Sequence, residues 1–176
     1  MQGRELAQAI FKASHLTGDF KLRSGLTSKE YFDKYRFESQ PELLWAIAQA
    51  MKPLIPKGTQ LLAGLEMGGI PVATALSLVS GIPVIFVRKK AKDYGTCRIA
   101  EGVGTLKDMR VCIIEDVVTT GGQVVISAQD LRAEGALLED VLCVISRQQG
   151  GEGNMAKAGL TMMSLFTQEQ LKASAK

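Results

Sequence analysis

Two adjacent acids and the turn after them form the segment with the clearest potential for chemistry. Glu115 and Asp116 follow the apolar run 111–114, and the turn 117–122, with the sequence VVTTGG, comes next. Ligands of open α/β sheets bind beyond the carboxyl ends of strands, and a glycine-rich turn at a helix N-terminus offers N–H groups to a phosphate. The acids cannot bind phosphate, so we expect them to accept hydrogen bonds from sugar hydroxyls or to help hold hydrated Mg²⁺. This predicts a site for a phosphorylated ribose; the alternative is an ordinary capped turn with solvated acids.

A second candidate is the basic segment 88–104, with the sequence RKKAKDYGTCRIAEGVG, which follows an apolar strand expected at 83–87. Its bases are Arg88, Lys89, Lys90, Lys92 and Arg98. The segment is long for a connection after a strand, so we expect it to be mobile. A mobile cationic loop can close over a polyanion, neutralise charge on a leaving group and exclude water. The alternative is a solvated run of charges.

The third candidate joins two distant segments. One is 21–37, which contains Arg23, Ser24, Tyr31 and Phe32. The other is the end of the apolar strand expected at 138–146, which Arg147 follows directly. An arginine at a strand end can pair with a carboxylate through two hydrogen bonds, and aromatic side chains can stack on a flat ring. From these residues alone, an ordinary surface is an equal alternative.

The elements that must position these groups alternate along the chain. Helices are expected at 4–16, 41–55, 70–80 and 122–134, the second of them beginning at Pro41 with Ser39 as its N-cap. Strands are expected at 60–64, 83–87, 110–115 and 138–146. Residues 18–37 predict short strands and turns, and residues 150–176 a turn, a short helix, a strand and a polar helical tail. Apolar strands separated by helices predict an α/β fold, with a parallel sheet covered on both faces.

Composition limits the class of protein. The 176 residues are 46% hydrophobic and 22% charged, which excludes a disordered or fibrous chain, and a net charge of +3 is too mild to indicate nucleic acid. Three widely spaced cysteines predict a reducing, cytoplasmic setting, with Cys112 and Cys143 in the core and Cys97 incidental. The uncharged stretch 67–87 contains glycines and prolines, so we expect a helix and a strand there, not a membrane span.

Several segments together indicate a family. The run VCIIEDVVTTGG resembles the phosphoribosyl-pyrophosphate (PRPP) motif of type I phosphoribosyltransferases. Around it, FKLRSGLTSKEYFDKYRF, GLEMGGIPVATA, VRKKAKDYG and SRQQGG resemble the orotate phosphoribosyltransferases in order and spacing, from about residue 10 to residue 151.

The resemblance implies a single domain over 1–176, with a small hood mainly from 1–38, a core of about 39–150 and a C-terminal extension at 151–176. It implies a cytoplasmic pentosyltransferase of pyrimidine biosynthesis that converts orotate and PRPP to orotidine 5′-monophosphate and pyrophosphate. It also implies a homodimer whose basic loop reaches the neighbouring subunit's site. Mg²⁺ would be held mainly by PRPP and water, without direct protein ligands, near Glu115 and Asp116.

Residue roles follow from the matched motifs. The implied catalytic residues are Lys89, Lys92 and Asp116. Those implied to bind PRPP are Met67, Gly68, Arg88, Lys89, Lys92, Tyr94, Glu115, Asp116, Val117, Val118, Thr119, Thr120, Gly121, Gly122 and Gln123. Those implied to bind orotate are Arg23, Thr119 and Arg147.

Some positions depart from the family pattern. Lys90, Tyr94 and Ser146 stand where Glu, His and Asp are common, and Arg23 stands where many bacterial members have Lys. Tyr94 removes a proton donor to pyrophosphate, but Lys and Arg can still neutralise charge around a ribosyl oxocarbenium ion. His15, the only histidine, is expected to be structural or exposed.

Two alternatives remain open from the sequence. One is a phosphoribosyltransferase for another base, such as a purine, which would not need the cation of Arg147. The other is a non-catalytic PRPP-sensing regulator, although the lysines of the basic segment are retained.

Overall fold

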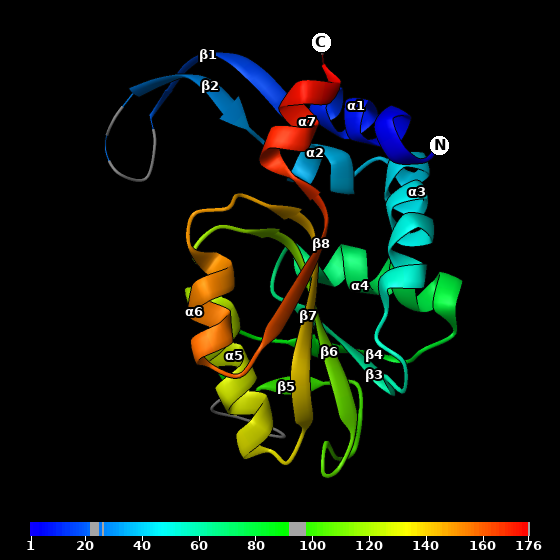
Figure 1. Cartoon of the computed structure of the whole chain (residues 1–176). Helices are drawn as coiled ribbons and strands as arrows, with labels where there is room; N and C mark the ends of the chain where they lie inside the picture. The colour runs from blue at the N-terminus through cyan, green and yellow to red at the C-terminus, as the bar shows by residue number, and fades with distance from the viewer. Residues whose placement is uncertain (22–24, 26, 92–97, 176) are drawn as a thin grey trace.

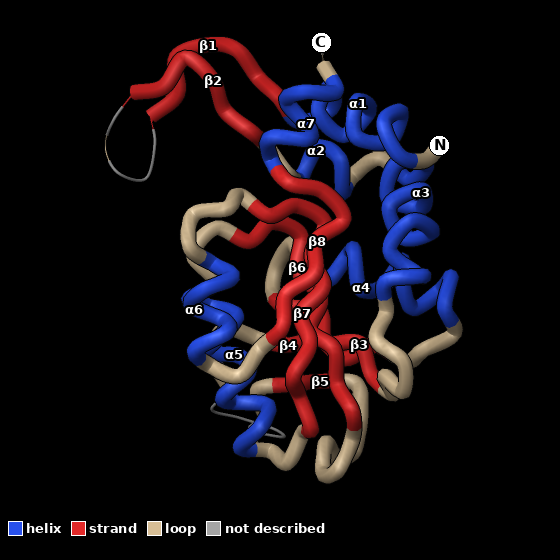
Figure 2. The backbone as a smooth tube through the Cα atoms, in the orientation of Figure 1, coloured by secondary structure: helices blue, strands red, loops and turns tan. Residues whose placement is uncertain are grey.

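A six-stranded sheet forms the centre of the chain (Figures 1 and 2). The computed structural model describes residues 1–21, 25, 27–91 and 98–175. The strands are β3 (Leu61–Leu65), β4 (Val84–Val87), β5 (Ala100–Glu101), β6 (Arg110–Val118), β7 (Leu137–Ser146) and β8 (Thr161–Thr167). Their order is β5-β4-β3-β6-β7-β8, and every neighbouring pair is parallel except β4 with β5. The carboxyl ends of the central strands therefore meet at one edge of the sheet.

Two hydrophobic cores cover the two faces of this sheet. Successive residues of β6 alternate between them, so that Val111 and Ile113 pack in one core and Cys112 and Ile114 in the other. Helices α5 (Gly122–Ala133) and α6 (Gly151–Lys157) close the first core. Helices α3 (Pro41–Met51) and α4 (Gly69–Ser80) close the second, and Figure 1 shows the two pairs on opposite sides of the sheet. The expected α/β fold is confirmed, as is the core position of Cys112.

A hood lies over one end of the sheet and is built from both ends of the chain (Figure 1). It comprises α1 (Gly3–Ser14), the hairpin β1 (His15–Lys21) with β2 (Thr27–Phe32), α2 (Tyr35–Glu38) and α7 (Gln168–Ser174). Leu6 and Ile10 of α1 share a core with Leu171 of α7. Thr167 caps α7, because its hydroxyl accepts the N–H of Gln170 while the Gln170 side chain accepts the N–H of Thr167.

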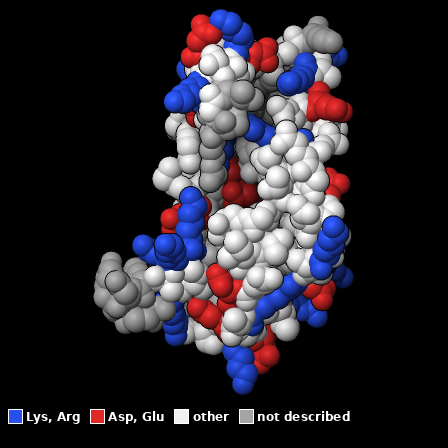
Figure 3. Space-filling view, turned by 90° about the vertical axis from the view of Figure 1, so that its left-hand side faces the viewer, with Lys and Arg blue, Asp and Glu red and all other residues white. Residues whose placement is uncertain are grey.

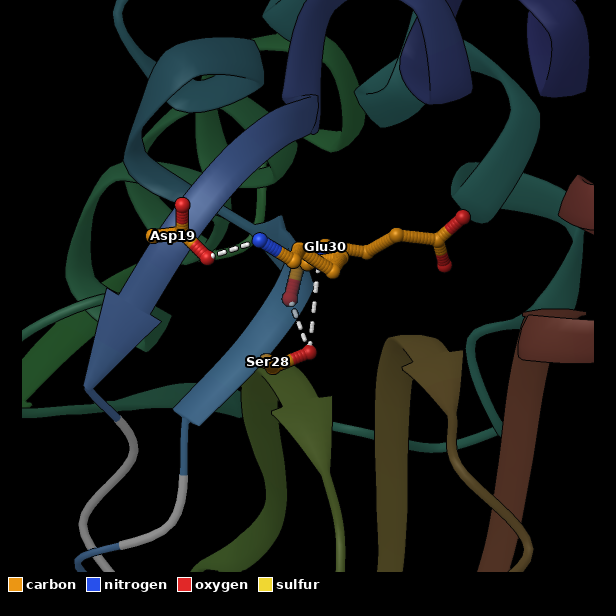
Figure 4. Close-up of polar contacts among 4 residues, drawn as sticks. Asp19, Ser28 and Glu30 are labelled. Carbon is orange, nitrogen blue, oxygen red and sulfur yellow. Dashed lines mark hydrogen bonds and ion pairs between the residues drawn. The ribbon is translucent and has the colours of Figure 1, made fainter.

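The hairpin extends from the hood as an arm (Figure 2). Figure 4 shows its polar contacts: the Lys29 ammonium lies 2.5 Å from the Asp19 carboxylate, and the Ser28 hydroxyl donates to the Glu30 carbonyl. The rings of Phe20 and Tyr31 stack with their centroids 5.5 Å apart. Exposed ion pairs contribute little, so cross-strand packing of this kind is the main support of the arm.

Three local expectations were wrong or incomplete. Strand β6 runs to Val118 and not to 115, because Val117 and Val118 continue the ladder with β7. Ser39 is not the N-cap of α3: Gln40 holds that position, and the Ser39 hydroxyl donates to the Arg36 carbonyl. Residues 35–38, expected among strands and turns, form the short helix α2.

The uncharged stretch divides as expected into a helix, α4, and a strand, β4, with Gly81 in the left-handed region ending the helix. Within the described residues, the helices are all too short or too polar to cross a membrane.

Candidate active site

The two acids of β6 lie directly against the turn that precedes α4. A Cβ placed on Gly68 would stand 1.7 Å from the Asp116 Oδ2 atom, and one on Gly69 would stand 2.4 Å from the Ile114 carbonyl oxygen. Only glycine at both positions lets the turn approach the strand this closely. Met67, the residue before them, is 59% exposed, so the outer side of this turn faces solvent.

Helix α2 of the hood and its N-cap residue add two titratable side chains to these acids. The Lys34 Nζ atom lies 2.6 Å from Asp116 Oδ2. Glu38 is buried, and its Oε1 atom would stand 3.1 Å from a Cβ on Gly68. The backbone N–H of Val117 donates to Asp116 Oδ1. Lys34 and Glu38 belong to no motif in the sequence and were not predicted as site residues, although their spacing of four would place them on one helical face.

Crowding of these groups shifts their pKa values in different directions. Burial, reinforced by Asp116, raises the pKa of Glu38 to about 9. Burial and the Asp116 charge also raise the pKa of Glu115 well above its usual value. Burial opposes ionisation of Asp116, but hydrogen bonds from Glu38 and Lys34 outweigh it and lower the pKa of Asp116. Asp116 is therefore the ionised acid of the group, and Glu38 is protonated at neutral pH.

Replacing Glu38 by Gln should stabilise the protein at neutral and alkaline pH. Because the pKa of Glu38 rises from 4.5 to about 9 on folding, the folded state binds a proton that the unfolded state has lost, and stability falls as pH rises through this window. Gln keeps the hydrogen bond without titrating. Denaturant unfolding should show Glu38→Gln and wild type converging below pH 4.5 and diverging up to about pH 9. Glu42→Gln, at an exposed position in α3, is the control. If the free energies of unfolding of Glu38→Gln and wild type changed in parallel with pH, the raised pKa of Glu38 would be contradicted.

The turn after the acids, residues 117–122, packs against α6. Gly121 has φ +73°, and a Cβ on it would lie 2.9 Å from the Met155 side chain. The Asn154 amide donates to the Thr120 carbonyl at 2.9 Å. The first N–H groups of α5 lack partners within the helix and point out of its N-terminus. Contacts with α6 thus hold the turn at the start of α5, and an arrangement of this kind can bind phosphate; the turn is called the cradle below.

The described start of the basic segment lies beside the turn before α4. The N–H of Lys89 donates to the Glu66 carboxylate at 3.3 Å, and the N–H of Arg88 donates to the Ile99 carbonyl. Lys89 and Lys90 are exposed. Lys92 and Tyr94, which the sequence placed in the site, lie outside the described residues.

A cavity of about 270 Å³ lies between the hood and the end of β7. Tyr31 and Phe32 of β2 line it together with Arg147, whose backbone N–H donates to the Val118 carbonyl at 2.9 Å. Phe11 of α1, His15 of β1, and Gln168 and Lys172 of α7 also line it. The contribution of α7 to this cavity was not predicted, because the sequence of a polar helical tail does not indicate which part of the protein the helix packs against. Arg23 lies outside the described residues.

Figure 3 shows a face of the molecule hollowed between hood and core, with acidic side chains at the bottom of the hollow. A larger cavity of about 510 Å³ lies at the opposite, amino ends of the strands, where Thr59, Arg110 and Leu137 line it. It is remote from the acids, the cradle and Arg147, so its size does not make it the site.

Comparison with known proteins identifies the family. No protein-family model matches the chain. The orotate phosphoribosyltransferase of Nocardioides sp. is 48% identical over 169 residues, which cover 96% of this chain and 94% of that protein. The chain belongs to the orotate phosphoribosyltransferase family. The resemblance found in the sequence is therefore confirmed.

Solved structures of the family agree with this assignment. The orotate phosphoribosyltransferase of Mycobacterium tuberculosis H37Rv in complex with Fe(III) dicitrate has a TM-score of 0.86 at 29% identity, covering 96% of this chain and 97% of that one. The same enzyme in complex with PRPP has a TM-score of 0.81 at 26% identity, covering 96% and 98%. The chain therefore has the type I phosphoribosyltransferase fold and is a pentosyltransferase by family.

Proposed function

We propose that the hollow between hood and core is where this orotate phosphoribosyltransferase transfers the 5-phosphoribosyl group of PRPP to orotate, releasing pyrophosphate. The observation that carries the proposal is the hydrogen bond from the Arg147 N–H to the Val118 carbonyl. It joins a residue of the base-sized cavity to the first residues of the phosphate cradle, so a base and a ribose phosphate bound there would be neighbours. The relative from Mycobacterium tuberculosis, solved with PRPP, supports the same donor.

PRPP is proposed to lie along the carboxyl edge of β3 and β6. The cradle formed by 118–123 would hold the 5′-phosphate, and Glu115 and Asp116 would accept hydrogen bonds from the ribose hydroxyls. The turn at Met67 and Gly68 would meet the pyrophosphate, together with cations of the basic segment. Cations beside the departing pyrophosphate stabilise the charge that develops as the bond to the ribose breaks.

Orotate is proposed to occupy the cavity beside Arg147. The guanidinium would pair with the orotate carboxylate, and Tyr31 and Phe32 offer aromatic surface to its ring. Thr119, in the turn after Val118, would lie toward the base. Arg23 is proposed as a further orotate-binding residue.

Mg²⁺ is proposed to enter with PRPP. Among the described residues, no group of three or more His, Cys, Asp or Glu is placed to hold a metal ion. Asp116 already engages Lys34 and the Val117 N–H. These residues do not form a direct ligand set, so no step is assigned to a protein-bound metal. Phosphate oxygens and water are the ligands that Mg²⁺ usually keeps at such sites.

A cytoplasmic homodimer is proposed as the working form, with the basic segment of each subunit closing over the site of its partner. The support is the family pattern of the sequence, which implies a basic loop that reaches the neighbouring subunit's site.

The test is loss of orotate absorbance on adding PRPP and Mg²⁺, with wild type and Arg147→Ala. Wild type should consume orotate only when both are present. Arg147→Ala should raise the KM for orotate about ten- to a hundred-fold, because it removes a charge-assisted hydrogen bond worth about 1.5–3 kcal/mol, while the KM for PRPP stays near that of wild type. Arg4→Ala, at an exposed site in α1, is the control.

The other outcomes separate the alternatives. Consumption of a purine base in place of orotate would indicate a different acceptor. Binding of PRPP without turnover of either base would indicate a regulator. An unchanged orotate KM in Arg147→Ala would remove Arg147 from the base site.

A further inference from the structure

Residues at the two ends of α2, in the hood, lie beside the Asp116 side chain of β6. Lys34 has helical backbone angles at the start of α2, and Glu38 ends the helix four residues later. Side chains at this spacing share a face. The Lys34 ammonium lies 2.6 Å from Asp116 Oδ2, and the Glu38 carboxyl lies against the same glycine, Gly68, as the Asp116 carboxyl. A helix of the hood thus contacts the acid that the proposed function assigns to ribose.

The Asp116 carboxylate is fixed and fully enclosed. Its side chain is 0% exposed, whereas that of Lys34 is 31% exposed. The Val117 N–H binds Oδ1 and Lys34 binds Oδ2. Each carboxylate oxygen can accept more than one hydrogen bond, so Asp116 has lone pairs left when both partners are bound. What these partners determine is the direction in which its remaining lone pairs point.

Lys34 also acts on the acids around Asp116. Its charge opposes the rise in the pKa of Glu38 and Glu115 and contributes to the lowered pKa of Asp116. PRPP is a polyanion, and three carboxyl groups beside its ribose would repel it if all were ionised and unpaired. A cation from the hood offsets that repulsion at the ribose.

We propose that Lys34 is a positioning residue of the PRPP site, whose ammonium orients Asp116 toward the ribose hydroxyls and ties the hood to β6. The inference rests on the proposed function, since it takes PRPP as the ligand. Lys34 follows β2 and Asp33, whose N–H donates to the Ser14 carbonyl at the end of α1.

The test compares Lys34→Met, which keeps the length and removes the charge, with Lys34→Arg, which keeps the charge. Calorimetric titration with PRPP and steady-state kinetics should show Lys34→Met with a KM and Kd for PRPP raised about ten-fold or more. Its kcat and orotate KM should stay within about two-fold of wild type, since an interaction made equally in ground and transition states affects KM alone. Lys34→Arg should recover most of the affinity. Lys12→Met, at an exposed lysine of α1, is the control.

Each other result overturns a defined claim. Unchanged PRPP affinity in folded Lys34→Met would overturn the inference and leave the proposed function intact. Equal weakening of PRPP and orotate, without recovery by arginine, would show that Lys34 merely supports the hood. If the wild-type protein neither bound PRPP nor consumed orotate, the proposed function itself would be overturned. Lys34→Gln, which retains a hydrogen-bond donor, provides the same comparison if Lys34→Met does not fold.

Discussion

An alanine at position 68 should remove most of the affinity for PRPP. The added methyl carbon would stand 1.7 Å from Asp116 Oδ2 and 2.5 Å from its Cγ, so the carboxylate or the turn must move. Asp116 is enclosed and held by Lys34, so it has no free space to move into. We expect the PRPP KM of Gly68→Ala to rise about ten- to a hundred-fold, which corresponds to the loss of one hydrogen bond to a charged group. Overpacking should also lower the free energy of unfolding by about 1–3 kcal/mol.

Kinetics and denaturant unfolding of Gly68→Ala measure both effects. Gly153→Ala in α6 is the matched control, because a Cβ there meets nothing within 4 Å and the residue is exposed. That variant should retain the PRPP affinity of wild type. A folded Gly68→Ala protein with a wild-type PRPP KM would mean that the turn does not lie against Asp116 in the working enzyme.

Two inactive variants should regain activity when their subunits are mixed. Lys89→Ala removes a cation from the basic segment, and Asp116→Asn removes the acid from the ribose site. If the segment acts on the partner's site, a mixed dimer has one site with an intact acid and an intact loop. Random reassociation makes about half of the dimers mixed, so the mixture should recover about a quarter of wild-type activity.

The mixture is made by reversible unfolding or by co-expression, and each variant alone gives the baseline. Mixing two batches of the same variant controls for effects of handling. A mixture as inactive as its parents would contradict loop sharing, because a segment that serves only its own subunit leaves every site with one defect. Activity of either variant alone at wild-type level would remove that residue from the site.

Local patterns predicted the central architecture well. The apolar run that became β3 and the apolar stretches of β6 and β7 are buried on both faces, so their composition alone indicates parallel strands. The run that became β4 is equally apolar, although Phe86 in it is exposed. The end of β6 was placed too early because acids usually mark a strand's end, yet Val117 and Val118 continue to pair with β7. Whether a ladder continues depends on the neighbouring strand, which a local pattern does not describe.

The candidate site was predicted from its motifs, but its supports were not. The acids, the turn after them and Arg147 were all identified in the sequence, and their proposed roles stay predictions. Lys34 and Glu38 were missed because a lysine and a glutamate at a spacing of four are typical of solvated helix faces. Only the approach of the hood to β6 turns this face inward. Lys92, Tyr94 and Arg23 lie outside the described residues, so their roles also stay predictions.

The pairing of α1 with α7 has a consequence during synthesis of the chain. The turn after Glu115 and Asp116 rests on Met155 and Asn154 of α6, whereas the cavity beside Arg147 also needs Gln168 and Lys172 of α7. Because translation runs from the N-terminus, the residues that hold the turn are all made before those that complete the cavity. Helix α1, the first to be made, must wait for α7, the last, to pack against it, and chains truncated before α7 would keep the supports of the turn but lack part of the cavity lining.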